Sequence, residues 1–188
     1  MIKAIIFDCF GVLTQNKWSS ILAGLDENVR SEVRDLHRAF DKAFISYEEF
    51  CGHLKEMTDL TQKELDETFM YRKGYDKNTD LLEYIAELSK DYKVSVLSNV
   101  GTNWIRDKFL TTDETALFTD MVLSYEVGLG KPDPDIYRLA LERLSIEPEE
   151  AVFVDDQLLY CDVAKSLGMG AIVYTNFAQF KHELQTLL

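Results

Sequence analysis

The chain has 188 residues, of which 46% are hydrophobic and 28% are charged, which excludes a mainly disordered or fibrous protein and favours a globular one. Its 20 basic and 33 acidic residues give a formal net charge of −13, and a surface of that sign repels the phosphates of nucleic acids and of anionic lipids. We therefore expect neither nucleic acid nor a membrane as a partner.

The three cysteines, Cys9, Cys51 and Cys161, show neither CxxC nor Cys/His ligand spacing. They predict neither a disulfide framework nor a zinc site, and this usage is typical of the reducing cytoplasm. The apolar N-terminal run is interrupted at Asp8, before it reaches the length of a signal peptide, and no later apolar run is long enough to span a bilayer. We expect a cytoplasmic protein without a targeting segment.

Short apolar runs that are rich in β-branched residues predict buried parallel strands. In chain order they cover residues 2–7, 93–97, 151–154 and 171–174, with 121–123 as a further candidate. Helical patterns alternate with these runs. The clearest helix begins with Asp133 as N-cap and Pro134 in its first turn, and a later one ends just before Gly168. This alternation predicts an α/β fold with a doubly wound parallel sheet.

Residues 16–75 interrupt the alternation, because they contain several helix starts and no convincing strand. Two pairs there have the spacing of a capping box, Ser46 with Glu49 and Thr61 with Glu64. A helical insertion between the first strand and the rest of the sheet is the simplest interpretation.

Polar side chains stand where the predicted strands end, and ligands of an open parallel sheet bind outside those carboxyl ends. The set comprises Asp8 after the first strand, Ser98 and Asn99 after the second, Lys131 in a loop, and Asp155 and Asp156 after a later strand. Taken singly, each residue also has an ordinary interpretation as a turn, a helix cap or a surface charge. Carboxylates gathered at one edge repel one another unless a cation lies between them, so the set favours a metal site.

In order and spacing, these residues resemble the four motifs of the haloacid dehalogenase superfamily over nearly the whole chain. The motifs are an Asp ending the first strand, a Ser or Thr ending the second, a Lys, and an acidic pair after a later strand. The tract from Lys131 to Gly168 looks especially like phosphatase-type members, which carry a helical cap after the first motif. The resemblance implies a Rossmann-like core of residues 1–15 and 76–188 and a small helical cap of residues 16–75.

The resemblance also implies a chemistry. Asp8 would attack a phosphorus or carbon centre and form a covalent aspartyl intermediate. Mg²⁺ prefers oxygen ligands, and it would be held by Asp8, Asp156 and the carbonyl of Phe10, with Asp155 bound through water.

The remaining motifs would bind the substrate. Ser98 and the backbone around Asn99 would hydrogen-bond the transferring group, and Lys131 would neutralise charge on Asp8 and on the substrate. The expected substrate of such an enzyme is a small phosphorylated metabolite.

One position departs from the pattern. Superfamily phosphatases usually have a second Asp two residues after the nucleophile, which protonates the leaving group, and this chain has Phe10 there. A phenyl ring cannot transfer a proton, so this function is either missing, which would limit turnover, or supplied from elsewhere. Two alternatives to a phosphatase follow: a metal-independent 2-haloacid dehalogenase, and a weakly active or inactive binding protein of the same fold.

Specificity is expected to reside in residues 16–75. The residues of this stretch that offer contacts to a substrate are Lys17, Trp18, Arg30, Arg34, Arg38, Lys42 and Arg72. Histidines such as His37 are expected to be exposed or to pack against neighbours.

Overall fold

The computed structural model describes residues 1–15 and 18–188. Five parallel strands form one sheet in the order β3-β2-β1-β4-β5. Their bounds are Ala4–Phe7 for β1, Lys93–Ser98 for β2, Asp120–Leu123 for β3, Ala151–Asp155 for β4 and Gly170–Val173 for β5. All five predicted strands, including the candidate at 121–123, are therefore present, and the doubly wound α/β fold is confirmed.

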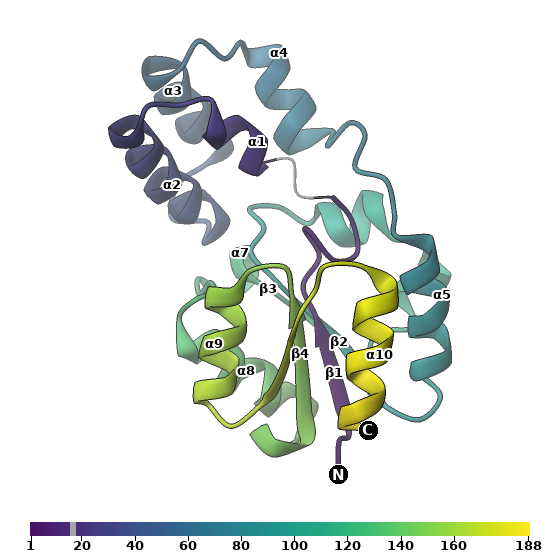
Figure 1. The fold of residues 1–188 in the computed structure, drawn as a ribbon. Helices are drawn as coiled ribbons and strands as arrows, with labels where there is room; N and C mark the ends of the chain where they lie inside the picture. Colours follow the sequence, from purple (N-terminus) through teal and green to yellow (C-terminus); the bar gives the residue numbers. More distant parts are fainter. Residues whose placement is uncertain (16–17) are drawn as a thin grey trace.

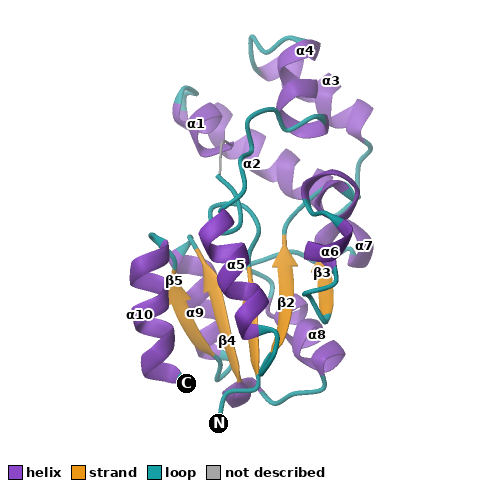
Figure 2. Cartoon of the chain, turned by 90° about the vertical axis from the view of Figure 1, so that its right-hand side faces the viewer, coloured by secondary structure: helices purple, strands orange, loops and turns teal. Residues whose placement is uncertain are grey.

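Helices cover both faces of the sheet (Figures 1 and 2). Side chains alternate along a strand, so Ile5 and Phe7 of β1 point to one face, and Ala4 and Ile6 to the other. The first face is covered by α5 (Thr79–Leu88) and α10 (Phe177–Leu187), and the second by α8 (Pro134–Leu144) and α9 (Leu158–Ser166). Two apolar cores therefore hold the sheet in place.

The helix termini follow the predicted signals. Asp133 caps α8 by accepting a hydrogen bond from the backbone N–H of Asp135, with Pro134 in the first turn. Gly168 follows α9 with φ +95°, a conformation that glycine adopts without strain. Shorter elements complete this half of the chain: η2 (Ile105–Phe109), α6 (Thr112–Thr115), α7 (Ser124–Val127) and η3 (Pro148–Glu150).

Between β1 and α5 the described residues contain helices and no strand of the sheet, and the helices lie over the carboxyl ends of the strands (Figures 1 and 2). They are α1 (Trp18–Ala23), α2 (Glu27–Asp41), α3 (Tyr47–Met57), α4 (Gln62–Leu65) and the π-helical turn η1 (Asp66–Met70). We call them the helical segment. Both predicted capping boxes form, at Ser46 and at Thr61, and a separate apolar core that includes Phe50 and Leu54 holds the helices together.

The C-terminal end of α2 is tied to the sheet half of the molecule. Ser124 Oγ donates a hydrogen bond of 2.5 Å to the carbonyl oxygen of Asp41. The Phe40 ring lies so close to Gly101 that a Cβ at that glycine would come within 2.4 Å of it. These contacts fix the end of α2 above the strand ends.

None of the helices in the described parts of the chain combines the length and the hydrophobicity needed to cross a membrane.

Candidate active site

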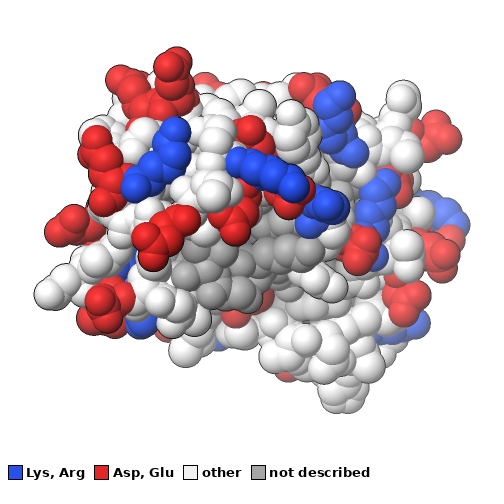
Figure 3. Space-filling model, turned by 90° about the horizontal axis from the view of Figure 1, so that it is seen from above, with Lys and Arg blue, Asp and Glu red and all other residues white. Residues whose placement is uncertain are grey.

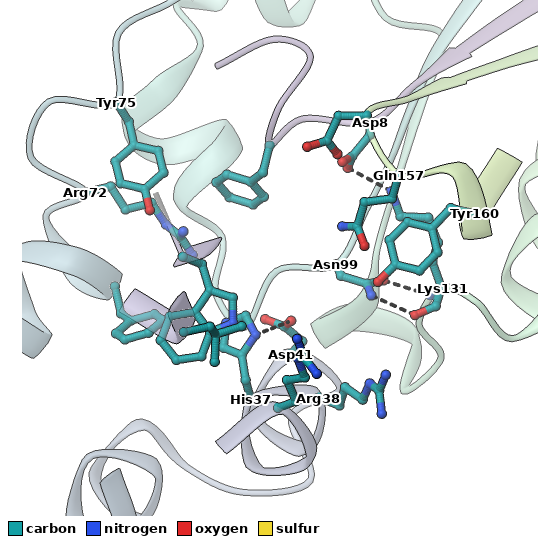
Figure 4. Close-up of a pocket in the computed structure, with 16 residues that line it drawn as sticks. Asp8, His37, Arg38, Asp41, Arg72, Tyr75, Asn99, Lys131, Gln157 and Tyr160 are labelled. Carbon is teal, nitrogen blue, oxygen red and sulfur yellow. Dashed lines mark hydrogen bonds and ion pairs between the residues drawn. The ribbon is translucent and has the colours of Figure 1, made fainter. Parts of the chain in front are cut away.

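A cavity of about 410 Å³ lies between the carboxyl ends of the strands and the helical segment (Figure 4). From the sheet half it is lined by Asp8, Phe10, Asn99, Lys131, Asp156, Gln157 and Tyr160. From the other side it is lined by Trp18, Leu22, Arg34, His37, Arg38, Asp41, Phe69, Arg72 and Tyr75. The cavity therefore combines residues that are far apart in the sequence.

Three carboxylates meet at the strand ends. Asp8 follows β1, where its backbone N–H donates to the Val154 carbonyl of the neighbouring strand β4, and Asp155 ends β4. One oxygen of each of Asp8, Asp155 and Asp156 lies within 4.8 Å of the others. Pairing of β1 with β4 brings the first and last predicted motifs together, so the chain has a cluster of oxygen donors where a divalent cation fits.

Lys131 is buried among these carboxylates. Its Nζ lies 2.9 Å from Asp8 Oδ1 and 2.5 Å from Asp155 Oδ2, and its side chain is 1% exposed. Burial alone lowers the pKa of Lys131, but the Asp155 and Asp8 carboxylates outweigh it and raise that pKa well above its ordinary value. The lysine is therefore a fixed positive charge beside Asp8.

Asn99 positions this lysine. Its side-chain Oδ1 accepts a hydrogen bond from the Lys131 backbone N–H at 2.8 Å, and its Nδ2 donates to the Lys131 carbonyl at 2.9 Å. Ser98, which ends β2, is fully buried, and its Oγ has no hydrogen-bond partner among the described residues. Ser98 does not belong to the cavity lining, whereas Asn99 does.

Gly11 allows Asp156 to approach the first motif. A Cβ at Gly11 would lie 2.2 Å from Asp156 Oδ2, and its φ of +93° is one that other residues adopt only under strain. The turn after β1 therefore needs a glycine for the acidic cluster to form.

The Phe10 side chain belongs to an aromatic cluster at the cavity wall. Its ring centroid lies 6.0 Å from those of both Tyr75 and Trp104, and the Arg72 guanidinium carbon lies 4.5 Å above it. Arg72 is buried, with a left-handed φ of +44°. The side chain at position 10 therefore makes aromatic packing contacts and a cation–π contact, and it supplies no carboxyl group.

We expect Phe10→Ala to lower the free energy of unfolding by about 2 kcal/mol. Replacing a fully buried phenylalanine by alanine costs roughly 3–5 kcal/mol of stability, and Phe10 is only partly buried, so the cost should be smaller. Thermal or urea unfolding measures the change. Phe44→Ala is a matched control, since Phe44 is 67% exposed and should have almost no effect. Equal effects of the two variants would contradict a structural role for the Phe10 ring.

One face of α2 lines the cavity. Arg34, His37, Arg38 and Asp41 follow one another at the spacing of a single helix face. Two of these residues, His37 and Asp41, were not among the predicted contacts. His37 does pack as expected, 4.5 Å from the ring of Trp18, but it also faces the cavity. The spacing was present in the sequence, yet a polar helix face is usually solvated.

Of the other substrate contacts predicted in residues 16–75, some line the cavity and others do not. Trp18 and Arg72 line the cavity, whereas Arg30 is engaged with Glu27 and with two backbone carbonyls. Lys42 lines a smaller adjoining cavity of about 240 Å³. Lys17 lies outside the described residues.

Seen from above, this end of the molecule shows acidic and basic side chains next to one another (Figure 3).

Comparison with known proteins identifies relatives along the whole chain. The model of the haloacid dehalogenase-like hydrolases matches residues 2–168. The D-ribitol-5-phosphate phosphatase of Bacteroides thetaiotaomicron is 30% identical over 207 residues, which span 100% of this chain and 99% of that protein. The phosphorylated carbohydrates phosphatase of Thermotoga maritima is 29% identical over 184 residues, which span 90% of this chain and 83% of that protein.

A similar solved structure is a HAD family enzyme from Bacteroides thetaiotaomicron, in complex with magnesium and inorganic phosphate. It superposes with a TM-score of 0.73 and 23% identity, over 97% of this chain and 99% of that chain. At this identity the likeness concerns the fold.

Proposed function

The chain belongs to the haloacid dehalogenase-like hydrolases, and on that basis we propose that it is a magnesium-dependent phosphatase of small phosphate monoesters. The observation that carries the proposal is the cluster of Asp8, Asp155 and Asp156, two of which pair with Lys131, beside a cavity that Asp8 and Asp156 line. Two relatives that act on phosphorylated sugars or polyols, as their names state, support this substrate class.

The acidic cluster fits magnesium. Its donors are carboxylate oxygens within 4.8 Å of one another, and Lys131 pairs with two of them, Asp8 and Asp155. In the proposal, Asp8, Asp156 and the Phe10 carbonyl hold the ion, with Asp155 bound through water. When bound, magnesium would neutralise negative charge on the phosphoryl group and on Asp8.

Asp8 is the proposed nucleophile. Its carboxylate would attack phosphorus and form an aspartyl-phosphate, which divides one difficult displacement into two easier ones. Lys131, fixed by Asn99 through its backbone, would hold Asp8 in place and attract a phosphoryl oxygen. Ser98 Oγ has no hydrogen-bond partner among the described residues, and this supports a further hydrogen bond to the transferring group, because a buried hydroxyl without a partner is costly.

The helical segment is the proposed cap. Its location over the strand ends supports a role in shielding the site from water and in selecting the substrate. We also place the protein in the cytoplasm, and its three buried cysteines, all free thiols, support that expectation.

The function is tested with a panel of sugar phosphates, polyol phosphates and 2-haloacids, each assayed with and without magnesium. We expect phosphate release from the phosphate esters only when magnesium is present. Halide release that does not need magnesium would favour the dehalogenase, and no release of either product would favour the binding protein.

Asp156→Ala should abolish magnesium binding, because it removes one of three clustered carboxylates and the remaining pair is already engaged by Lys131. Calorimetric titration with Mg²⁺ measures the loss. Asp162→Ala, an exposed position on α9, is the matched control and should bind like the parent. A parent protein that takes up no magnesium would contradict the proposed cofactor.

A further inference from the structure

Phe10 takes the position, two residues after Asp8, at which the acid of related phosphatases was expected, so the proposed phosphatase lacks a proton donor at that position. We propose that Asp41, at the end of α2, is a catalytic residue that supplies this acid and base function from the helical segment. This inference rests on the proposed function, and it concerns a residue that the motifs at the strand ends do not include.

The location of Asp41 is the first support. It lines both the main cavity and the adjoining smaller one, and it is 5% exposed. Figure 4 shows Asp8 and Asp41 on facing sides of the main cavity, Asp8 on the strand side and Asp41 on the helix side. A phosphate ester attacked by Asp8 would point its leaving group away from that carboxylate, because the attacking and leaving oxygens are roughly in line. The side facing Asp41 is therefore where a proton is needed.

The second support is that Asp41 is held in place from the opposite half of the molecule. Ser124 Oγ, at the start of α7, donates to the Asp41 carbonyl oxygen. Phe40, the residue before Asp41, packs against Gly101 after β2. A general acid must lie within hydrogen-bond reach of the atom that it protonates. The tie to Ser124 fixes Asp41 relative to the strand ends that carry Asp8.

The third support is the pKa of the Asp41 carboxyl group. Burial raises the pKa of Asp41 to about 7, with Asp8 adding to the rise and with Arg72 and Lys131 opposing it. A carboxyl with that pKa carries a proton in part of the molecules near neutral pH, so it can donate one and later accept one.

The groups that face Asp41 are consistent with this role. On α2 itself they are His37 and Arg38, and from other elements they are Arg72, Lys131 and Asp8. His37 Nδ1 lies 3.4 Å from Asp41 Oδ2, and because burial and then Arg72 lower the pKa of His37 to about 3, the imidazole is neutral. The contact is therefore polar and not an ion pair.

The proposed hydrolysis takes place in two steps. In the first, the Asp8 carboxylate forms a bond to phosphorus, the bond from phosphorus to the ester oxygen breaks, and the Asp41 carboxyl proton passes to that oxygen to give the free alcohol. In the second, water attacks phosphorus, the bond to Asp8 breaks, and the Asp41 carboxylate takes a proton from the water. Inorganic phosphate leaves, and both aspartates return to their starting states.

Asp41→Asn tests the proposal, with one alkyl phosphate and p-nitrophenyl phosphate as substrates in the presence of magnesium. We expect kcat for the alkyl ester to fall by about 10²- to 10⁴-fold, the usual contribution of a positioned acid or base. The nitrophenolate leaving group needs little protonation, so the variant should release a burst of it and accumulate protein phosphorylated at Asp8. In the parent, the rate of phosphoryl transfer from the alkyl ester should fall as pH rises through about 7, where Asp41 loses its proton. This fall in rate with pH should be absent in the variant.

Glu32→Gln, an exposed position on the same helix, is the matched control and should keep the parent's rates. An Asp41→Asn variant that changes only KM, or that slows phosphoryl transfer from both substrates equally, would overturn the catalytic role while leaving the phosphatase function intact. A parent without phosphatase activity on either ester would overturn the proposed function, and this inference with it.

If Asp41→Asn does not fold, the role of Asp41 is tested on the parent protein with substrates that differ in their leaving group. Across a series of phosphate esters, an enzyme that protonates the leaving group should show phosphoryl-transfer rates that depend only weakly on the pKa of the leaving alcohol. A steep dependence would overturn the assignment of Asp41 as the acid.

Discussion

Asp8→Asn should abolish turnover, with a loss of phosphate release greater than the roughly 10²- to 10⁴-fold that a positioned acid or base contributes. An amide at this position cannot form the proposed aspartyl-phosphate, so both chemical steps fail. The variant should still fold, because Lys131 keeps its 2.5 Å contact with Asp155 after one of its two carboxylate partners is removed. Steady-state phosphate release with magnesium measures the activity, and thermal unfolding measures the fold.

Mass spectrometry adds a direct test of the intermediate. Parent protein stopped during turnover should gain one phosphoryl group on the peptide that contains Asp8, and the variant should gain none. Asp91→Asn, an exposed aspartate, should behave like the parent. Turnover that survives in Asp8→Asn would contradict the assignment of the nucleophile.

Lys131→Met should destabilise the protein by roughly 3–5 kcal/mol, the usual result of removing one partner of a buried ion pair. Without the lysine, the buried carboxyl groups of Asp8 and Asp155 would lose the cation that pairs with both, and their side chains are only 6% and 0% exposed. For a chain of this length the expected fall in melting temperature is about 10 °C. Differential scanning calorimetry without magnesium measures it.

Magnesium should restore part of this loss, because the acidic cluster of Lys131→Met would again have a cation beside it. Lys165→Met, an exposed lysine on α9, is the control and should unfold near the parent temperature. If the two variants were equally stable, the charge of Lys131 would not be what holds the carboxylates together. A melting temperature that magnesium leaves unchanged would argue against the metal site.

Much of the fold was determined by the sequence itself. β-branched apolar runs cannot remain in water and are too short for helices, so residues 93–97 and 151–154 could be assigned as buried strands before the structure was known. The N-cap Asp133 and the glycine at 168 marked helix ends for local reasons of hydrogen bonding and backbone conformation. Parallel strands then brought their carboxyl ends to one edge, which is why Asp8, Asp155 and Lys131 could be expected together.

The helical side of the cavity could not be predicted in this way. The spacing of Arg34, His37, Arg38 and Asp41 places them on one face of α2, but a helix face can point to solvent or to a neighbouring element with the same sequence pattern. The packing of Phe40 against Gly101 and the hydrogen bond from Ser124 orient that face towards Asp8. The positions of the strand-end residues follow from local rules of strand and helix formation, so they could be predicted from the sequence. The residues that face them are set by contacts between distant segments, so only the tertiary structure decided them.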